Sequence, residues 1–274
     1  MPPTSKLFLP LTSLSGCLMA GIFRDTRGAD LSAADRLNHF PASPIVAITL
    51  VQHGTLHILP PETSWRTASE APSLPRSSVL APQDVPVTSW SEGSVVALTV
   101  GVYPDAWRRL GGDDSYQAML PIFDEALGNF DAESDAADGW DRFCTTLVSG
   151  WRKARPQGWE PVTRVADWSK ALATRAALSG GGRSLRSIER RIMRFSGHTR
   201  RNLAFYSAFE RLHECATNAA GRSLAEIAIE VGYSDQSHMG RAVRRATGFS
   251  PARLNRAIET EEPFWCYRLL GERF

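Results

Sequence analysis

The sequence predicts an α+β protein with a β-rich, sandwich-like or barrel-like amino-terminal domain, helices that follow it, and an all-α carboxyl-terminal domain with two helix-turn-helix units. Three observations predict this class: β-branched runs between residues 44 and 102, helical periodicity after residue 104, and two helix-turn-helix patterns between residues 171 and 256. The 274 residues are enough for two domains. We therefore expect one domain over residues 1–155, including a helical appendage, and another over residues 161–260.

Short strands are predicted in the first half of the chain. Residues 45–51 form a β-branched run, residues 56–59 form a second run after a turn at His53-Gly54, and residues 95–102 form a third. The intervening residues 60–94 are rich in proline and serine, which favours loops and edge strands. These segments indicate a small antiparallel sandwich or barrel.

Helices are predicted from Pro104 onward, because proline can open a helix and the apolar residues after it recur at helical spacing. Further helices are expected over residues 116–127 and 138–152. The second of these carries one apolar stripe that we expect to face the core, formed by Trp140, Phe143, Cys144, Leu147 and Trp151. Two prolines and a glycine in residues 153–161 then predict a domain linker.

Basic residues are concentrated in one segment. Residues 164–256 contain 17 Lys and Arg against 7 Asp and Glu, a net charge of +10, whereas the whole chain carries +2, so the remainder carries −8. A basic segment on an acidic body favours a polyanionic partner, since phosphate neutralisation supplies most non-specific nucleic-acid affinity. An ordinary solvated arginine-rich surface is the alternative interpretation.

Candidate metal ligands are few. His53 and His57 would share one face of a continuous strand, which raises a metal or ligand site as a hypothesis, but Gly54 favours a turn between them and no third ligand follows. Structural histidines are the favoured interpretation. The four cysteines lie far apart without ligand spacing, so we expect free thiols, no metal and no cofactor.

Residues 222–256 form the most informative segment. Ser223 can cap a helix with an apolar stripe, Gly232 can end it in a sharp turn, and Ser234 can cap a second helix that ends at Gly248. Pro251 can open a third helix. The second helix buries Met239, Ala242, Val243 and Ala246. Two short helices around a glycine turn describe a helix-turn-helix unit.

The outer side of that second helix is polar and basic. A helix of this kind fits the major groove of DNA, where side chains of the first turn reach base edges and arginine pairs with guanine or phosphate. The candidate DNA-binding residues of this unit are Ser234, Gln236, Ser237, His238, Arg241, Arg244 and Arg245.

Residues 225–238, AEIAIEVGYSDQSH, with the arginines 241 and 244 and TGFSP at 247–251, closely resemble the signature of the AraC/XylS family of transcription regulators. The family usually has an aromatic residue where Val243 stands, so this sequence departs from the pattern there. The resemblance implies a sequence-specific DNA-binding regulator, not an enzyme, with a second helix-turn-helix unit upstream.

A candidate for that first unit lies at the expected distance. Residues 171–178 would form its first helix, residues 179–182 the turn, and residues 184–195 the reading helix, which resembles the family's Ser-x-Arg-x-Leu-x-Arg-x-Phe pattern. We expect a buried stripe of Leu185, Ile188, Ile192 and Phe195. The candidate DNA-binding residues, with Arg194 beside them, are Arg183, Ser184, Arg186, Ser187, Arg190 and Arg191.

Three other function classes fit the sequence less well. The glycines 180–182 could form a phosphate loop, but no Lys-Ser/Thr pair follows them. If the protein were an enzyme, its active site would have to be assembled from residues far apart in the sequence, because no nucleophile elbow, zinc-protease motif or Walker loop occurs. A repair or adaptor protein with this DNA-binding fold would need thiolate metal ligands that are missing.

The resemblance also implies partners. Residues 202–218 would form a long helix that joins the two units, so the reading helices enter successive major grooves about 34 Å apart and cover roughly 17–20 base pairs of double-stranded DNA. A small-molecule effector, a homodimer and a contact with RNA polymerase are the further partners that the family suggests. No apolar run is long enough for a membrane span, and we expect a cytoplasmic protein.

Overall fold

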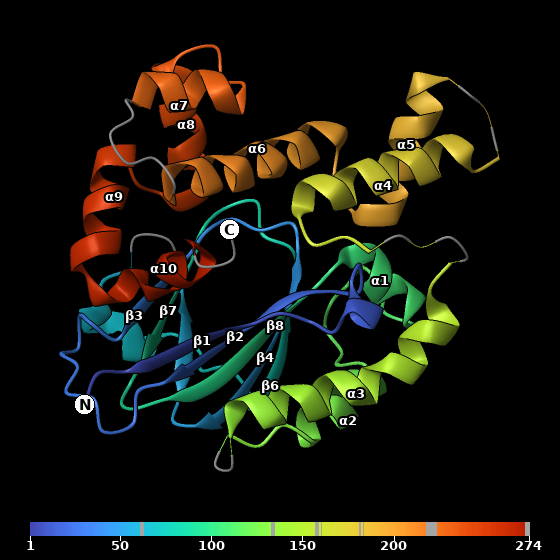
Figure 1. Ribbon diagram of the computed structural model, residues 1–274. Helices are drawn as coiled ribbons and strands as arrows, with labels where there is room; N and C mark the ends of the chain where they lie inside the picture. Colours follow the sequence, from blue (N-terminus) through green and yellow to red (C-terminus); the bar gives the residue numbers. More distant parts are fainter. Residues whose placement is uncertain are drawn as a thin grey trace.

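The computed structural model describes residues 1–60, 63–132, 135–156, 159, 161–180, 182, 184–217 and 224–271. Two antiparallel sheets lie in the middle of the molecule, with α2 and α3 along one side and the helices from α4 to α9 along the other (Figure 1). This arrangement confirms the predicted α+β class, with a β-rich amino-terminal part and a helical carboxyl-terminal part.

The larger sheet has five strands and the smaller has three. The larger sheet follows the order β1 (Thr4–Phe8), β2 (Leu18–Asp25), β8 (Val96–Val102), β4 (Val46–His53) and β6 (Ser77–Leu80). The smaller follows the order β3 (Leu37–Phe40), β7 (Val87–Ser91) and β5 (Leu56–Leu59). All of these pairings are antiparallel.

The turn predicted at Gly54 sends the chain from one sheet to the other, because β4 belongs to the larger sheet and β5 to the smaller. Gly54 has a φ of +78°, and a Cβ added there would lie 2.1 Å from the backbone oxygen of Ser94. Only glycine fits this turn without a clash.

Three strands in the first 40 residues were not predicted. Among them β2 lies inside the larger sheet, between β1 and β8. Its burial does not alternate cleanly along the strand, because most of its side chains are covered on both faces of the sheet. An apolar segment of this kind lacks the period of two that identifies a half-buried strand.

The helices of the amino-terminal part largely follow the prediction. They are α1 (Pro104–Arg109), α2 (Pro121–Gly128) and α3 (Ala136–Ala154), with short 3-10 turns at Thr12–Leu14 and Trp65–Glu70. Helix α2 begins later than expected, and Tyr116 before it has a φ of +52°. The apolar stripe of α3 is buried as predicted, each of its five side chains being at most 3% exposed.

The carboxyl-terminal helices are α4 (Val165–Leu178), α5 (Leu185–Ser196), α6 (Arg200–Thr217), α7 (Leu224–Val231), α8 (Gln236–Thr247) and α9 (Pro251–Thr260). Helix α6 runs between the α4–α5 unit and the α7–α8 unit (Figure 1). A 3-10 turn (Glu262–Phe264) and α10 (Trp265–Gly271) complete the described chain. Within the described segments, no helix is both long enough and apolar enough to cross a bilayer.

Helix α10, which the sequence did not predict, returns the chain to the sheets. Trp265, Cys266 and Leu269 are buried and pack with Leu7 of β1, and Ile22 and Phe40 also join this cluster. The Trp265 indole donates a hydrogen bond of 2.8 Å to the Asn38 side chain. Helix α10 therefore connects the helical part of the chain to strands near the amino terminus.

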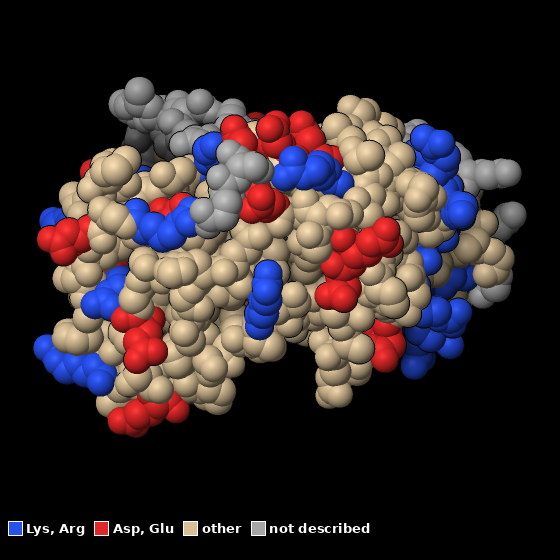
Figure 2. All heavy atoms as spheres, turned by 90° about the horizontal axis from the view of Figure 1, so that it is seen from below, with Lys and Arg blue, Asp and Glu red and all other residues tan. Residues whose placement is uncertain are grey.

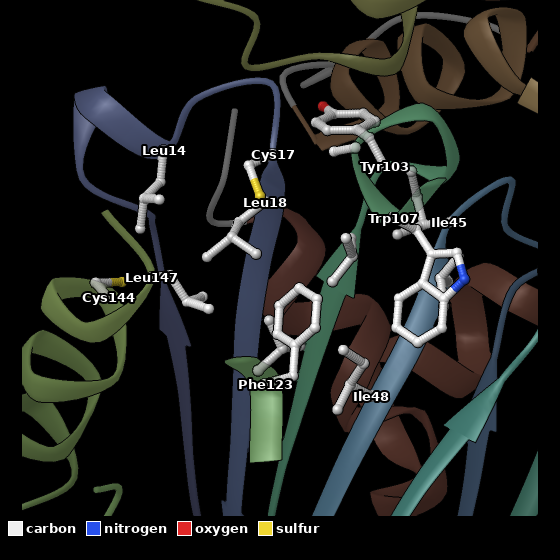
Figure 3. Close-up of a cluster of buried hydrophobic side chains, with 14 of the residues drawn as sticks. Leu14, Cys17, Leu18, Ile45, Ile48, Tyr103, Trp107, Phe123, Cys144 and Leu147 are labelled. Carbon is white, nitrogen blue, oxygen red and sulfur yellow. The ribbon is translucent and has the colours of Figure 1, made fainter. Parts of the chain in front are cut away.

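The main core begins between the sheet and its covering helices. In Figure 3, Leu18 of β2, Ile48 of β4, Phe123 of α2 and Leu147 of α3 lie in this interior. All four are fully buried. The same cluster continues into the helical part through α4, whose buried residues are Val165, Trp168, Leu172 and Ala176. The second helix-turn-helix unit instead belongs to a separate cluster.

The four cysteines are free thiols, and Cys17, Cys144 and Cys266 are buried. Burial raises the pKa of Cys144 and of Cys266 to about 12 each, so both remain protonated at neutral pH. Protonated, covered thiols are poor nucleophiles and behave as small apolar core residues.

Candidate nucleic-acid interface

Helix α5 is the predicted reading helix of the first unit. Ser184 caps it, its hydroxyl accepting from the Ser187 amide at 3.2 Å, and Gly197 ends it with a left-handed φ of +74°. Between these ends, four residues at positions i, i+3, i+4 and i+7 are exposed and share one face: Arg186, Glu189, Arg190 and Met193. Two guanidinium groups are therefore free to meet an anionic partner.

Arg191 is a correction to the predicted interface. It is only 7% exposed, and its guanidinium donates to the carbonyl oxygens of Ala176 at 2.7 Å and Gly182 at 2.9 Å. These bonds hold the end of α4 and Gly182 against α5, so Arg191 does not point outward as expected. The outward face of α5 therefore does not include Arg191.

The structure differs from two further predictions for this unit. Leu185, predicted to be buried, is 60% exposed on the first turn of α5, whereas Ile192 is buried and Ile188 and Phe195 are half-buried. Arg183 lies outside the described residues. Ser187 is half-buried, and its hydroxyl lies 2.9 Å from that of Ser184.

Helix α8 is the predicted reading helix of the second unit. Its cap is Asp235 rather than the predicted Ser234: the Asp235 carboxylate accepts from the His238 amide at 2.7 Å, and this bond lowers the pKa of Asp235. The predicted inward stripe is buried as expected. The outward residues are all exposed, namely Ser234, Gln236, Ser237, His238, Arg241, Arg244 and Arg245.

Arg245 lies at the margin of this exposed face. Its guanidinium carbon is 4.0 Å from the ring centroid of Phe205 on α6, and it donates to the Asn202 side chain at 3.2 Å. These contacts hold Arg245 against α6. Arg241 and Arg244 project from the more open side of α8, where Ser237 precedes them by four and seven positions.

The carboxyl ends of both reading helices are fixed to the amino-terminal part. Arg108 of α1 donates to the carbonyl of Arg194 at the end of α5, and the backbone amide of Ala42 donates to the carbonyl of Ala246 in α8 at 2.7 Å. His198, just after α5, donates from Nε2 to the Pro44 carbonyl at 3.2 Å. The amino-terminal turns of α5 and α8 therefore point away from these contacts.

Residues 181–257 match the family model of a helix-turn-helix domain. The match covers α5, α6, α7 and α8. It therefore lies in the part of the chain whose sequence resembles the AraC/XylS family.

Solved structures similar to this protein share little sequence with it. They include unsaturated fatty acid bound wild-type ToxT from Vibrio cholerae strain SCE256, at 12% identity and a TM-score of 0.37 over 79% of this chain and 93% of that one. ToxT from Vibrio cholerae O395 has 10% identity and a TM-score of 0.37 over 92% of this chain and 96% of that one. The AraC-like transcriptional activator CuxR has 10% identity and a TM-score of 0.22 over 98% of this chain and 100% of that one. No curated protein matches this chain.

The first unit is fixed to the amino-terminal part of the chain through a buried carboxylate. Asp105 of α1 accepts from the Trp168 indole of α4 at 2.8 Å and pairs with Arg175 of the same helix. Burial raises the pKa of Asp105, although Arg175 and the Trp168 bond oppose the shift. Glu210 of α6 caps the start of α4 by accepting from the Val165 amide at 3.0 Å.

The histidines singled out in the sequence are not brought together. His57 is buried and its Nδ1 lies 2.7 Å from the Ala71 carbonyl, whereas His53 is exposed and its Nε2 lies 3.1 Å from the Ser94 hydroxyl. His213 of α6 donates from Nε2 to the Tyr267 carbonyl at 3.1 Å, and burial lowers its pKa. All three fit roles in packing and turn formation.

Charged side chains of both signs lie on the face seen in Figure 2. Several Lys and Arg gather at its right edge, and acidic and basic groups are interspersed over the rest.

Proposed function

We propose that this protein is a transcription regulator that recognises double-stranded DNA by inserting the amino-terminal turns of α5 and α8 into two successive major grooves. The observation that carries this proposal is the pair of exposed basic faces that α5 and α8 present. The 18 residues of the joining helix α6 span about 27 Å, which is comparable with the roughly 34 Å of one turn of DNA.

The side chains suggest how the two grooves would be read. Arg186 and Arg190 of α5 and Arg241 of α8 have the length and fork geometry for guanine, and Gln236 on the first turn of α8 fits adenine. Ser184, Ser187, Ser234, Ser237, His238, Arg244 and Arg245 would contribute contacts to phosphate or base edges. A site of roughly 17–20 base pairs follows from this spacing.

The test removes one arginine from each reading helix. Arg190→Ala and Arg241→Ala should each weaken binding to a selected operator by about 1–3 kcal/mol, measured by gel shift at fixed salt. Arg76→Ala is the matched control, because it removes the same charge from an exposed position on the amino-terminal domain. Binding of the intact protein should also weaken steeply as salt rises from 50 to about 200 mM, through counterion release.

Unchanged operator affinity in both reading-helix variants would exclude this mode of recognition. An equal loss in Arg76→Ala would mean that net charge, rather than contact by the two helices, governs the affinity. Homodimer formation and contact with RNA polymerase stay predictions from the family resemblance.

We also propose control by a small molecule, on the strength of a cavity between the sheets and the DNA-binding domain. The cavity has a volume of about 260 Å³ and is lined mainly by apolar side chains. The described residues that line it include Glu210 and His213 but no Lys or Arg. An uncharged, largely apolar effector fits such a site. Apolar lining residues from both parts of the chain include Met19, Ile22, Leu80, Phe209 and Leu270.

The wall of this cavity includes the segment that contacts both helix-turn-helix units. Residues 40–45 line it, and within them Ala42 bonds to Ala246 of α8 and Pro44 accepts from His198 after α5. An effector that displaces this segment would change how the two reading helices are held. Coupling of this kind requires that the effector bind the two arrangements with different affinity.

An uncharged fluorescent probe, N-phenyl-1-naphthylamine, tests the cavity. We expect it to bind the full chain, and Ala47→Phe, which fills the cavity from β4, should abolish its fluorescence enhancement. Ala171→Phe on α4, outside the lining, is the control for a general effect of added aromatic bulk. Equal probe binding by Ala47→Phe and the unsubstituted chain would exclude an effector at this position.

A further inference from the structure

The exposed face of α5 contains one acidic residue among its basic ones. Glu189 lies between Arg186 and Arg190 on the stripe that ends at Met193, and all four side chains are exposed. The corresponding stripe of α8 consists of Ser237, Gly240, Arg241 and Arg244, so Gly240 occupies the position equivalent to Glu189. The two reading helices therefore differ at one place in the middle of their outward faces.

Protein contacts do not account for Glu189. In the described part of the chain, its carboxylate makes no hydrogen bond and no ion pair, and it lies too far along α5 to cap the helix. A carboxylate on a surface that approaches phosphates is repelled by them. Such a group is favourable at a DNA interface only where it meets a hydrogen-bond donor.

The major groove supplies donors from two bases. Adenine presents its N6 amino group beside the N7 acceptor, which repels a carboxylate, whereas cytosine presents its N4 amino group without a neighbouring acceptor of its own. A carboxylate is acceptor-only when ionised, so it favours cytosine over the other three bases.

We propose that Glu189 accepts a hydrogen bond from the N4 amino group of a cytosine and thereby selects one base pair in the groove that α5 enters. This inference rests on the proposed function, since it requires α5 to lie in a major groove. Arg186 and Arg190 supply the affinity at this half-site, and Glu189 supplies discrimination at the cost of some affinity for DNA in general.

The proposal predicts an effect of opposite sign to that of an arginine variant. Glu189→Ala removes a negative charge near phosphates, so affinity for random-sequence duplex should rise about twofold or more, whereas preference at one base pair should be lost. Glu189→Gln replaces the carboxylate with an amide that can both donate and accept, so the preferred base should change from cytosine to adenine.

The experiment uses the full chain and duplexes enriched from a random pool by the unsubstituted protein. Each base pair of the enriched site is then exchanged in turn, and affinities are measured at fixed salt. We expect one cytosine-to-thymine exchange to weaken the unsubstituted protein about tenfold and Glu189→Ala by less than about twofold. Glu259→Ala, on exposed α9 of the same domain, is the charge-matched control and should keep the tenfold preference.

The outcomes separate this inference from the proposed function. If Arg190→Ala weakens binding while Glu189→Ala keeps the full preference at every position, Glu189 is a solvated surface carboxylate and the inference is overturned alone. If neither variant changes binding, α5 does not read DNA and both proposals fail. Circular dichroism of the variants should match the unsubstituted chain, because position 189 is exposed.

Discussion

The two helix-turn-helix units have the same local plan but different supports. Each has a reading helix with a side-chain cap at its start and a left-handed glycine at its end, Gly197 in one and Gly248 in the other. The first unit shares the core of the amino-terminal domain through α4, whereas the second has its own apolar cluster around Val231 and Met239. A shared local plan therefore does not imply that the two units depend equally on the rest of the chain.

The two units differ in the contacts that hold α5 and α8 in position. Helix α5 keeps its position through contacts that cross from α1 to α4, so a change in the amino-terminal domain reaches it through packed side chains. Helix α8 contacts that part of the chain through the Ala42 amide, and Phe249, just after the helix, makes an edge-to-face contact with His39. We expect perturbations at the domain boundary to affect the first unit more strongly than the second.

We expect the largest loss in the free energy of unfolding from Asp105→Ala, which leaves Arg175 and the Trp168 indole without their buried partner. Removing one member of a buried charge pair costs about 3–5 kcal/mol. Urea unfolding should show this loss, and hydrogen exchange should rise in α4 and α5 more than in α7 and α8. Equal protection changes in both units would contradict the comparison.

Arg191→Met should have the next largest effect. The substitution keeps the apolar stem but leaves the carbonyls of Ala176 and Gly182 without their donor, which costs about 1–3 kcal/mol. Arg194→Met, on an exposed position of the same helix, is the matched control and should unfold within about 0.5 kcal/mol of the unsubstituted chain. Similar unfolding midpoints for the two variants would mean that Arg191 is not a brace.

Acidification should act on the second unit through His39. Burial beside Phe249 and Phe264 lowers the pKa of His39 from 6.5 to about 4, so the folded state holds it neutral while the unfolded state takes up a proton below pH 6.5. This stability is present above pH 6.5 and is lost as pH falls towards 4. Between pH 7 and 5 the loss should be about 1–2 kcal/mol.

The measurement is urea unfolding at both pH values, with His39→Gln as the comparison. The variant cannot take up the proton, so its stability should fall by less over the same interval. A pH dependence that is identical in the two proteins would assign the acid effect to other groups.

The smallest expected effect is that of Asp84→Ala. Asp84 is exposed, and its carboxylate accepts from the Tyr206 hydroxyl at 2.6 Å and contacts the Asn202 amide at 3.4 Å. Because water can replace an exposed acceptor, we expect a loss below about 1 kcal/mol in thermal unfolding. If Asp84→Ala lost as much stability as Asp105→Ala, the exposed contact of Asp84 would matter as much as the buried contact of Asp105, contrary to this account.

The sequence predicted the helical half of the molecule more completely than the sheets. Helices α7 to α9 carry a period of about 3.6, glycine turns and capping residues, and their bounds follow the prediction closely. Strand β2 was missed because it is covered on both faces, and α10 was missed because its side chains pack against distant strands. Contacts between distant segments leave no local pattern.

The candidate site was also predicted only in part. Exposure of the outward residues of α8 follows from helical spacing, but the burial of Arg191 depends on the carbonyls that the end of α4 presents to it. The cap at Asp235 in place of Ser234 is a choice between two suitable neighbours that only the backbone conformation decides. Spacing identifies the face of a helix, and tertiary packing decides its limits.

Footprinting of the unsubstituted chain on a selected operator tests the central claim most directly. Simultaneous insertion of α5 and α8 predicts two protected segments on one side of the duplex, about one turn or 10 base pairs apart, with Arg190→Ala weakening one segment and Arg241→Ala the other. A single protected segment that both variants weaken alike would contradict reading by two helices.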